Sequence, residues 1–381
     1  MIAPLAALLA LAAPGGATPD GHAAGARVVV EVLARAAPRS LAVEGAGLRA
    51  SFRARGDDLL LDGRQVPEPH RLEARAWRVL PAGAPARTYR AALDLRAEGG
   101  LLRVRAEMDL EGYVAEVVAS ETEPGTPAEA LAAQAVVVRS YALAARGRHA
   151  DGALCDLAHC QVLRAHGHGR GHLAAARAAA RATAGEVLAL PSGEVALAPF
   201  HAACGGHTAD PREAFGGEGT GAASVPDPGC HARPWRAWID GGVLARAVRG
   251  ALERSGDAAA PGIPARLRAA DLVLVEGRGG WISRVSTRDG RARLSGDAFA
   301  RGVDGALGRG EVRSSRFALA DEGGSVTLRG TGAGHGVGLC QAGAAGRAAA
   351  GEDHRAILRH YFPRAAIGAL EGARLTSAPR R

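Results

Sequence analysis

The chain has 381 residues, of which 47% are apolar and only 4% aromatic. That length allows one large domain or two ordinary ones, with a core built mainly from Val, Leu and Ala. The formal net charge is +8, and all 47 cationic residues are Arg. No Arg cluster alternates with aromatic residues as on a nucleic-acid-binding face, so nucleic acid is not expected as a partner.

The first 26 residues have features of an export signal. Residues 2–13 form an apolar run that is too short to cross a bilayer as a helix, and Ala24-Gly25-Ala26 offers a small-x-small cleavage site. The positively charged segment that usually precedes the apolar run is missing. No later segment is apolar enough to span a membrane, and no lipid-anchoring Cys follows the run. We therefore expect an exported protein, periplasmic or associated with the cell wall, whose mature chain has no stable membrane span.

Residues 27–108 are β-rich, with short β-like runs at 27–33 and 101–106 between Gly and Pro residues. Asp109 can then cap a helix that runs to about Ser120, with apolar residues at helical spacing.

A second helix is predicted from a capping box at residues 126–129, with Pro127 at its first helical position, to about Arg146. The later segments are predicted as a Cys/His-rich loop at 149–172, an Ala-rich helix at 173–184, strands leading to a Gly turn at 203–208, loops at 209–235, mixed helices and strands at 236–330, and a last helix around 356–361.

Glu121 is the strongest candidate for a catalytic acid. It follows the three valines of the first helix at steps of seven, four and three, so it continues their apolar stripe. Burial against apolar walls would raise its pKa, as a general acid at neutral pH requires. Spacing alone nevertheless favours an ordinary Glu turned to water at a helix end. Glu123 is a nearby alternative that faces elsewhere, and Glu116 lies off the stripe.

The loop from His149 to Cys160 contains the ligand types of a zinc site: His149, Cys155 and Cys160, with His159 between them. Its spacing matches none of the common structural zinc motifs, and a Cys155–Cys160 disulfide is an equal alternative in an oxidising compartment. The nearby His166, His168 and His172 are interpreted as loop decoration.

Two Gly-containing turns carry further polar residues. At residues 201–208 a Cys204 nucleophile with His201 as its base is conceivable, but a structural turn with Cys204 in a disulfide is favoured. Cys204 and Cys230 flank one loop-rich stretch, so Cys230 is the expected disulfide partner. Cys340 is then left as a buried thiol. Residues 334–338 lack the Lys-Ser/Thr ending of a P-loop, so their glycines indicate close backbone packing.

Four motifs, in order, resemble the stage II sporulation protein D family (SpoIID/LytB). They lie at residues 110–121 with 129–143, at 155–162, at 200–208, and at 332–344 followed by 357–363. The resemblance covers about residues 95–368. We therefore expect a β-rich region at 27–95, which matches the family only in its β-like character, a SpoIID/LytB-like catalytic domain at 96–370 and a tail at 371–381. The expected fold is α+β, a mixed helical core with a β-rich N-terminal part and a long substrate groove.

The resemblance implies a peptidoglycan lytic transglycosylase. Such an enzyme cleaves the bond between N-acetylmuramic acid and N-acetylglucosamine with one carboxyl group and forms a 1,6-anhydro ring. Its catalytic Glu corresponds to Glu121, and no cofactor is required. A stretch like 149–160 is linked to zinc in some members and to a disulfide in others. The residues expected to bind substrate are Ser120, Gln134, Arg139, Tyr141, Gln161, His201, His335 and Gln341.

One departure from the family concerns the residues after Glu121. The family usually reads Ser-Glu-Met-Pro, whereas here Thr122, Glu123 and Pro124 follow. We expect the extra negative charge of Glu123 to raise the pKa of Glu121 further. Two other functions remain: a non-catalytic glycan-binding activator of a cell-wall amidase, and, ranked last, a zinc hydrolase using the His149/Cys155/Cys160 group.

Overall fold

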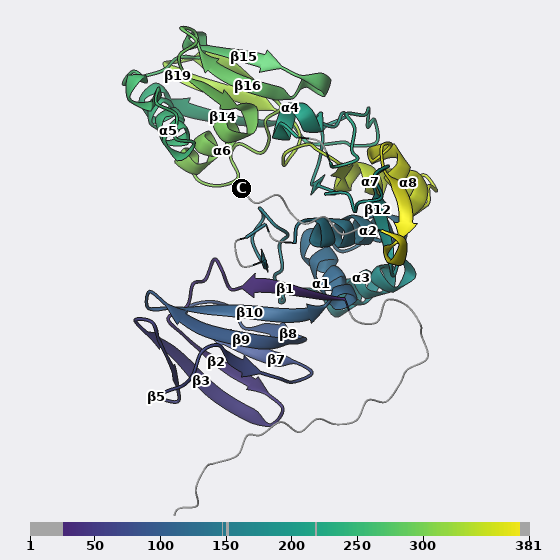
Figure 1. Ribbon diagram of the computed structural model, residues 1–381. Coiled ribbons are helices and arrows are strands. Elements are labelled where there is room, and N and C mark those ends of the chain that lie inside the picture. The colour runs from purple at the N-terminus through teal and green to yellow at the C-terminus, as the bar shows by residue number, and fades with distance from the viewer. Residues whose placement is uncertain (1–25, 147, 150–151, 218, 374–381) are drawn as a thin grey trace, which may run out of the picture.

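The computed structural model describes residues 26–146, 148–149, 152–217 and 219–373. This part of the chain contains both helices and strands, with strands alone before Leu110, which confirms the mixed α+β prediction (Figure 1). The predicted signal segment, apart from Ala26, and residues 374–381 of the predicted tail lie outside the described residues. No helix in the described part of the chain combines the length and apolarity needed to cross a bilayer.

Two sheets form the N-terminal part. Burial alternates along their long strands, so every second side chain faces the core between the sheets. The five-stranded sheet has the order β11-β1-β10-β9-β6 and the six-stranded sheet the order β5-β4-β3-β2-β7-β8. The five strands are β1 (Arg27–Val32), β6 (His70–Leu72), β9 (Ala91–Glu98), β10 (Leu101–Asp109) and β11 (Leu154–Cys155). The six are β2 (Ser40–Gly45), β3 (Leu48–Arg55), β4 (Asp58–Leu61), β5 (Arg64–Gln65), β7 (Trp77–Pro81) and β8 (Arg87–Tyr89).

The domain boundary expected after residue 95 is wrong, because it falls inside β9. That strand pairs with β10 along its whole length, and β10 continues directly into the first helix. A hydrophobic core extending from Val28 to Val195 joins both sheets to the helices that follow. The β-rich region and the start of the helical region are therefore one structural unit.

Three helices complete this unit: α1 (Leu110–Glu121), α2 (Ala128–Ala144) and α3 (Arg170–Ala182). Asp109 caps α1 as predicted, since its carboxylate accepts the Gly112 N–H at 2.9 Å. The capping box predicted for α2 is not formed. Pro127 is the N-cap residue and gives no side-chain bond, while the carboxylate of Glu129 instead accepts the N–H of His354 at 2.8 Å.

Residues 235–330 form a second unit with its own hydrophobic core, at the top of Figure 1. This separate core is a departure from the expected single catalytic domain at 96–370. The unit contains two three-stranded sheets, β14-β19-β18 and β15-β16-β17, and two helices. Its elements are β14 (Trp235–Asp240), α5 (Gly241–Arg254), β15 (Leu272–Glu276), β16 (Ile282–Thr287), β17 (Arg293–Ser295), α6 (Gly296–Leu307), β18 (Phe317–Glu322) and β19 (Ser325–Gly330).

A third core joins one face of α2 to the segments that flank the 235–330 unit. Two short strand pairs close it: β12 with β21 in antiparallel fashion, and β13 with β20 in parallel. The elements are β12 (Glu186–Ala189), β13 (Phe200–His201), α4 (Pro211–Phe215), β20 (Leu339–Cys340), α7 (Gln341–Ala349), α8 (His354–Tyr361) and β21 (Ala366–Ala369). The 235–330 unit is therefore an insertion between two strands that pair with each other.

Candidate functional site

Glu121 is the last residue of α1 and is held from two sides. Its carboxylate oxygen Oε1 accepts the backbone N–H of Val162 at 2.7 Å, and its backbone carbonyl accepts the side-chain amide of Gln341 at 2.9 Å. Val162 belongs to the loop that follows β11, and Gln341 begins α7. The loop after β11, in the first unit, and helix α7, beside the third core, thus both contact the predicted catalytic residue.

Burial raises the pKa of the Glu121 carboxyl. The Val162 N–H and the positive charge of Arg164 act in the opposite direction, because both favour the ionised form. Glu123, expected to raise this pKa further, is exposed; the charged side chain that acts on Glu121 is Arg164 and has the opposite sign. The prediction for Glu123 is therefore wrong, while the predicted desolvation of Glu121 is confirmed.

Ser120 is 4% exposed and makes internal bonds. Its hydroxyl donates to the Glu116 carbonyl at 2.7 Å and accepts the Arg164 N–H at 3.0 Å. Ser120 therefore fastens the same loop that reaches Glu121 through Val162. The structure gives it a positioning role, and the prediction that it contacts substrate is not supported.

Two of the histidines interpreted as loop decoration, His168 and His172, lie against the end of α1. His168 Nε2 is 3.3 Å from the Ser120 hydroxyl, and His172 Nε2 is 3.0 Å from the Thr122 carbonyl. Their interpretation as loop decoration is wrong. Nothing in their spacing indicated this contact, since about fifty residues separate them from α1.

Four side chains of the Cys/His-rich loop converge. The ligand atoms of His149, Cys155, His159 and Cys160 all lie within 4.8 Å of one another. His149 Nε2 is 3.3 Å from Cys160 Sγ, and His159 Nε2 is 3.1 Å from Cys155 Sγ. His159 was in the predicted stretch but not among the expected ligands. Both cysteines are free thiols here, so the alternative Cys155–Cys160 disulfide is not formed in this structure.

This donor set fits zinc. Two sulfur and two imidazole donors are the ligands of a closed tetrahedral site, in which neighbouring donor atoms lie about 3.5–3.8 Å apart. With four protein ligands such a site has no open position for water, which argues against the zinc hydrolase.

Tyr141 and Gln161 connect this loop to the helices. The Tyr141 hydroxyl donates to the His159 carbonyl at 3.1 Å, and the Gln161 amide oxygen accepts the hydroxyl of Tyr113 at 2.8 Å. Tyr141 is 7% exposed and Gln161 1%. Both were expected to bind substrate; both are instead buried and fix the loop against α1 and α2.

Arg139 was expected in the substrate groove, and this prediction is wrong. Its side chain is completely buried. Its Nε donates to one carboxylate oxygen of Glu111 at 2.8 Å and a terminal nitrogen to the other at 2.5 Å. Further bonds reach the carbonyls of Glu186 and Ala180 at 3.0 and 3.2 Å. Arg139 therefore joins α1, α2 and α3 and has no free donor face for a sugar.

Gln134 is also buried, at 1% exposure, and neither atom of its amide has a hydrogen-bond partner among the described residues. It cannot reach a polymer outside, so its substrate-binding prediction is not supported. Gln341 is only half-buried, and its amide already contacts Glu121. Of the two glutamines, Gln341 alone lies at the candidate site.

His201 and His335 lie together, with ring centroids 5.7 Å apart. His201 is 4% exposed, and its Nδ1 is 3.2 Å from the Val337 carbonyl. Burial lowers the pKa of His201 to about 3 and that of His335 to about 4, so both are neutral at pH 7. Cys204 contacts Asp227 rather than His201, so the Cys–His pair considered for this turn is not formed. His335 remains half-buried, and its contact with substrate stays a prediction.

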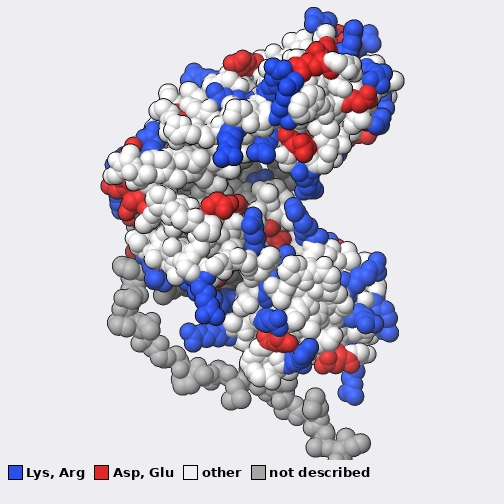
Figure 2. Space-filling view, turned by 180° about the vertical axis from the view of Figure 1, so that it is seen from behind, with Lys and Arg blue, Asp and Glu red and all other residues white. Residues whose placement is uncertain are grey.

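The predicted long groove has partial support. Figure 2 shows one side of the molecule hollowed between the 235–330 unit and the N-terminal sheets. Three cavities of about 610, 10 and 940 Å³ are lined mainly by residues of the 235–330 unit, and Glu121 lines none of them.

Comparisons with known proteins agree with the first half of the motif pattern. Residues 98–190 match the family model of SpoIID, described as a stage II sporulation protein. The chain is 27% identical over 258 residues to an uncharacterized protein of Brachyspira hyodysenteriae, a match that covers 67% of this chain and 66% of the relative. The chain thus spans slightly less than two thirds of that relative. The family resemblance is confirmed over residues 98–190, which contain Glu121 and the Cys/His group, and it indicates a cell-wall-related function.

Proposed function

We propose that this protein is a peptidoglycan lytic transglycosylase with Glu121 as its one acid/base, a function supported by the match of residues 98–190 to the SpoIID family model. The observation that supports this most is the state of the Glu121 carboxyl. It is desolvated, which raises its pKa, and one of its oxygens is fixed by the Val162 N–H. A general acid needs a carboxyl group that stays protonated to a higher pH than usual and is fixed in place.

One carboxyl group suffices for this reaction because no water is consumed. Protonated Glu121 donates its proton to the glycosidic oxygen as the bond to C1 of N-acetylmuramic acid breaks. The resulting carboxylate then accepts the proton of the C6 hydroxyl while O6 bonds to C1, which closes the 1,6-anhydro ring and restores the acid. Ordinary glycosidases need a second carboxylate to activate water or to attack the sugar. The Val162 N–H stabilises the carboxylate between the two steps.

We propose that zinc, held by His149, Cys155, His159 and Cys160, has a structural role here. The ion would supply four bonds that fix the loop, with no position left for substrate. The residues of that loop do the rest: Val162 and Arg164 bind the end of α1 through their N–H groups. The catalytic step itself needs no cofactor.

A non-catalytic alternative has one observation in its favour. The Val162 N–H and the charge of Arg164 both favour the ionised form of the Glu121 carboxyl, and an ionised carboxylate can accept hydrogen bonds from glycan hydroxyls without donating a proton. In that case the protein would stimulate a partner such as a cell-wall amidase. The two functions differ in whether the glycosidic bond is cut.

We further propose that the protein acts outside the cytoplasm, in the periplasm or on the cell wall. The proposal is supported by the apolar run at residues 2–13 and by the cell-wall-related family match. Amino-terminal sequencing of the protein recovered from the cell envelope would test it. A chain that begins near Arg27 is expected, and a cytoplasmic chain that retains residues 1–26 would contradict export.

Product analysis separates cutting from gripping. Purified sacculi and peptide-free glycan are digested with the wild-type protein, Glu121→Gln and the matched control Glu123→Gln, and the products are identified by mass spectrometry. Anhydro-muropeptides are expected from the wild type and from Glu123→Gln and not from Glu121→Gln. Their absence with the wild type, while glycan is still bound, would support the activator. If only Glu123→Gln lost these products, the catalytic acid would be Glu123 and not Glu121.

A further inference from the structure

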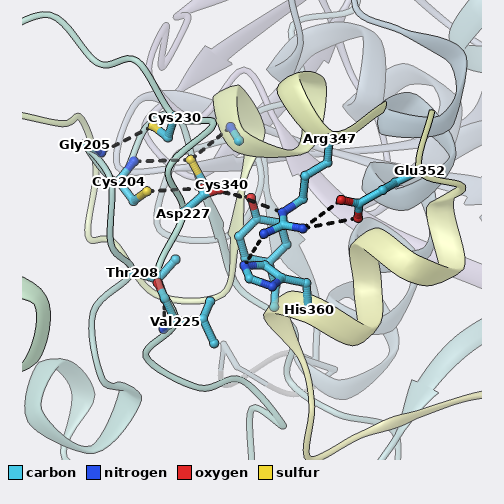
Figure 3. A network of polar contacts seen from close by, with 12 residues as sticks. Cys204, Gly205, Thr208, Val225, Asp227, Cys230, Cys340, Arg347, Glu352 and His360 are labelled. Atoms are coloured by element: carbon cyan, nitrogen blue, oxygen red, sulfur yellow. Dashed lines mark hydrogen bonds and ion pairs between the residues drawn. The ribbon is translucent and has the colours of Figure 1, made fainter. Parts of the chain in front are cut away.

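A second cluster of metal-ligating side chains lies outside the candidate site (Figure 3). Cys204, Asp227, Cys230 and Cys340 are all buried, and their ligand atoms lie within 4.8 Å of one another. They come from three segments that are far apart in sequence: the Gly turn after β13, the loop before the 235–330 unit, and the residue before α7. None of them contacts Glu121 or the His149/Cys160 group.

Backbone N–H groups point at two of the sulfurs. Cys340 Sγ accepts the N–H of Cys204 at 3.2 Å and the N–H of Gly343, in the first turn of α7, at 3.3 Å. Cys230 Sγ accepts the N–H of Gly205 at 3.3 Å. Hydrogen bonds and a helix N-terminus aimed at sulfur favour the thiolate, which is the form that binds a metal. The turn can make these bonds because Gly205 and Gly206 adopt positive φ angles of 71° and 108°.

Asp227 is the second observation that indicates a ligand. Its carboxylate is fully buried; Oδ2 accepts the Tyr361 hydroxyl at 2.9 Å and lies 3.2 Å from Cys204 Sγ. Oδ1 has no hydrogen-bond partner among the described residues, and Arg347 Nε lies 3.8 Å from it. A buried carboxylate with an unmatched oxygen is costly unless a cation completes its surroundings. Gly343 leaves the space for this carboxylate, since a Cβ there would collide with Asp227 and Tyr361.

A disulfide explains the cluster less well than a cation does. The expected Cys204–Cys230 bond is not formed, and all the cysteines of the chain are free thiols in this structure. A bond between any two of the three sulfurs would leave the third thiol and the Asp227 carboxylate buried together without a common partner. One divalent ion would satisfy all four groups, because a tetrahedral zinc site places its donors about 3.5–3.8 Å apart.

We propose that Cys204, Asp227, Cys230 and Cys340 form a second, closed site for a thiophilic divalent cation of the zinc type. Binding releases the thiol protons, and the ion takes up the negative charge that Arg347 only partly balances. The site ties the chain before the 235–330 unit to the chain after it. It therefore fixes the two strands, β13 and β20, from which that insertion departs.

The test is zinc counting on the full-length protein, purified without chelator, by elemental analysis and native mass spectrometry. Cys230→Ser is expected to lower the zinc content by about one ion per chain relative to the wild type. The matched control, Cys155→Ser in the His149/Cys160 group, is expected to leave the Cys230-dependent ion in place. An unchanged zinc content in Cys230→Ser would overturn the proposal, as would a disulfide between any two of Cys204, Cys230 and Cys340 in the wild type.

Two further measurements keep the test decisive if Cys230→Ser does not fold. Asp227→Asn keeps the volume of the side chain and removes its charge, and it is expected to weaken zinc binding at this site in chelator competition. X-ray absorption of the zinc-loaded wild type should show about 2.5 sulfur donors per zinc, the mean of three in this site and two in the His149/Cys160 group. A mean of two sulfur donors per zinc would overturn the proposal without any variant.

Discussion

Glu121 and Arg139 both belong to the motif helices, and both are largely buried, yet their surroundings differ. The Glu121 carboxylate accepts one backbone N–H, and burial raises its pKa. The Arg139 guanidinium is completely buried, with both oxygens of Glu111 and two backbone carbonyls as acceptors. A buried charge with such partners holds the helices in place. A desolvated carboxyl with only one hydrogen bond keeps its proton to a higher pH, so it can donate that proton and take it back.

Buried polar residues of the same motif can therefore have two different roles. A buried ionisable group contributes to stability when its hydrogen-bonding capacity is filled from inside the protein. It is available for chemistry when part of that capacity is left for a substrate. Variants at the two positions should therefore affect different measurements.

The largest effect is expected for Glu121→Gln. Loss of the acid/base should lower glycan cleavage by about 10³-fold, while the amide oxygen can still accept the Val162 N–H and keep the fold. Cleavage rates on peptide-free glycan and circular dichroism of the same sample check this. A cleavage rate of Glu121→Gln within tenfold of the wild-type rate would show that Glu121 is not the acid/base. Glu121 and Arg139 would then not differ in role.

Arg139→Ala should act on stability. Removing the guanidinium leaves Glu111 and the carbonyls of Ala180 and Glu186 without their donor, at a cost of about 3 kcal/mol in the free energy of unfolding. Water can relieve part of this cost, because the Glu111 side chain is 30% exposed. Urea denaturation measures the change.

A more exposed ion pair provides the matched control for that variant. Arg78 pairs with Glu44 at 2.7 Å; the Arg78 side chain is 52% exposed, and Glu44 is 30% exposed like Glu111, so Arg78→Ala should cost less than about 1 kcal/mol. Equal losses in Arg139→Ala and Arg78→Ala would show that burial of Arg139 adds nothing.

The pH dependence of stability should carry a signature of Glu121. Because its pKa is higher in the folded protein than the ordinary 4.5, the folded state holds the proton over a pH range where the unfolded chain has lost it. This contribution to stability is present at acid pH and is lost as the pH rises through the folded pKa. Glu121→Gln should remove that part of the slope.

Denaturation of the wild type and Glu121→Gln at several pH values between about 4 and 8 measures this difference. The same ionisation should set the alkaline limb of the cleavage profile, since the first step needs the protonated acid. Identical slopes for the two proteins would mean that the carboxyl is not desolvated.

The smallest effect is expected for Gln341→Ala. It removes the 2.9 Å bond to the Glu121 carbonyl, which is worth about 1 kcal/mol, and loosens the contact between α7 and α1. Cleavage should fall by less than about tenfold, because the carboxyl keeps its bond to Val162. A loss as large as that of Glu121→Gln would show that Gln341 touches the substrate.

Local patterns predicted the parts of the site that lie within one helix. Asp109 marked the start of α1, and the valine spacing placed Glu121 on the apolar side of that helix, because both depend on residues a few positions apart. Spacing alone nevertheless favoured a Glu turned to water, and the choice of Glu121 rested on the family resemblance. The same reasoning failed for the capping box predicted at residues 126–129, because Glu129 instead accepts a hydrogen bond from His354, which no local pattern indicates. It also failed for Arg139, since the residues around it in the sequence indicate neither its complete burial nor its pairing with Glu111.

Local sequence patterns were enough to predict the helices α1 and α2, a glutamate on the apolar side of α1 and the ligand types of the His149–Cys160 loop, because those groups lie within one or a few helical turns or within one short loop. Only the tertiary structure decided which polar residues are sealed inside, that residues 235–330 have their own core, and that Cys204, Asp227, Cys230 and Cys340 meet. The reason is physical: contacts between residues more than a hundred positions apart, such as the Cys204 N–H with Cys340, arise from the packing of whole elements and leave no periodic trace along the chain.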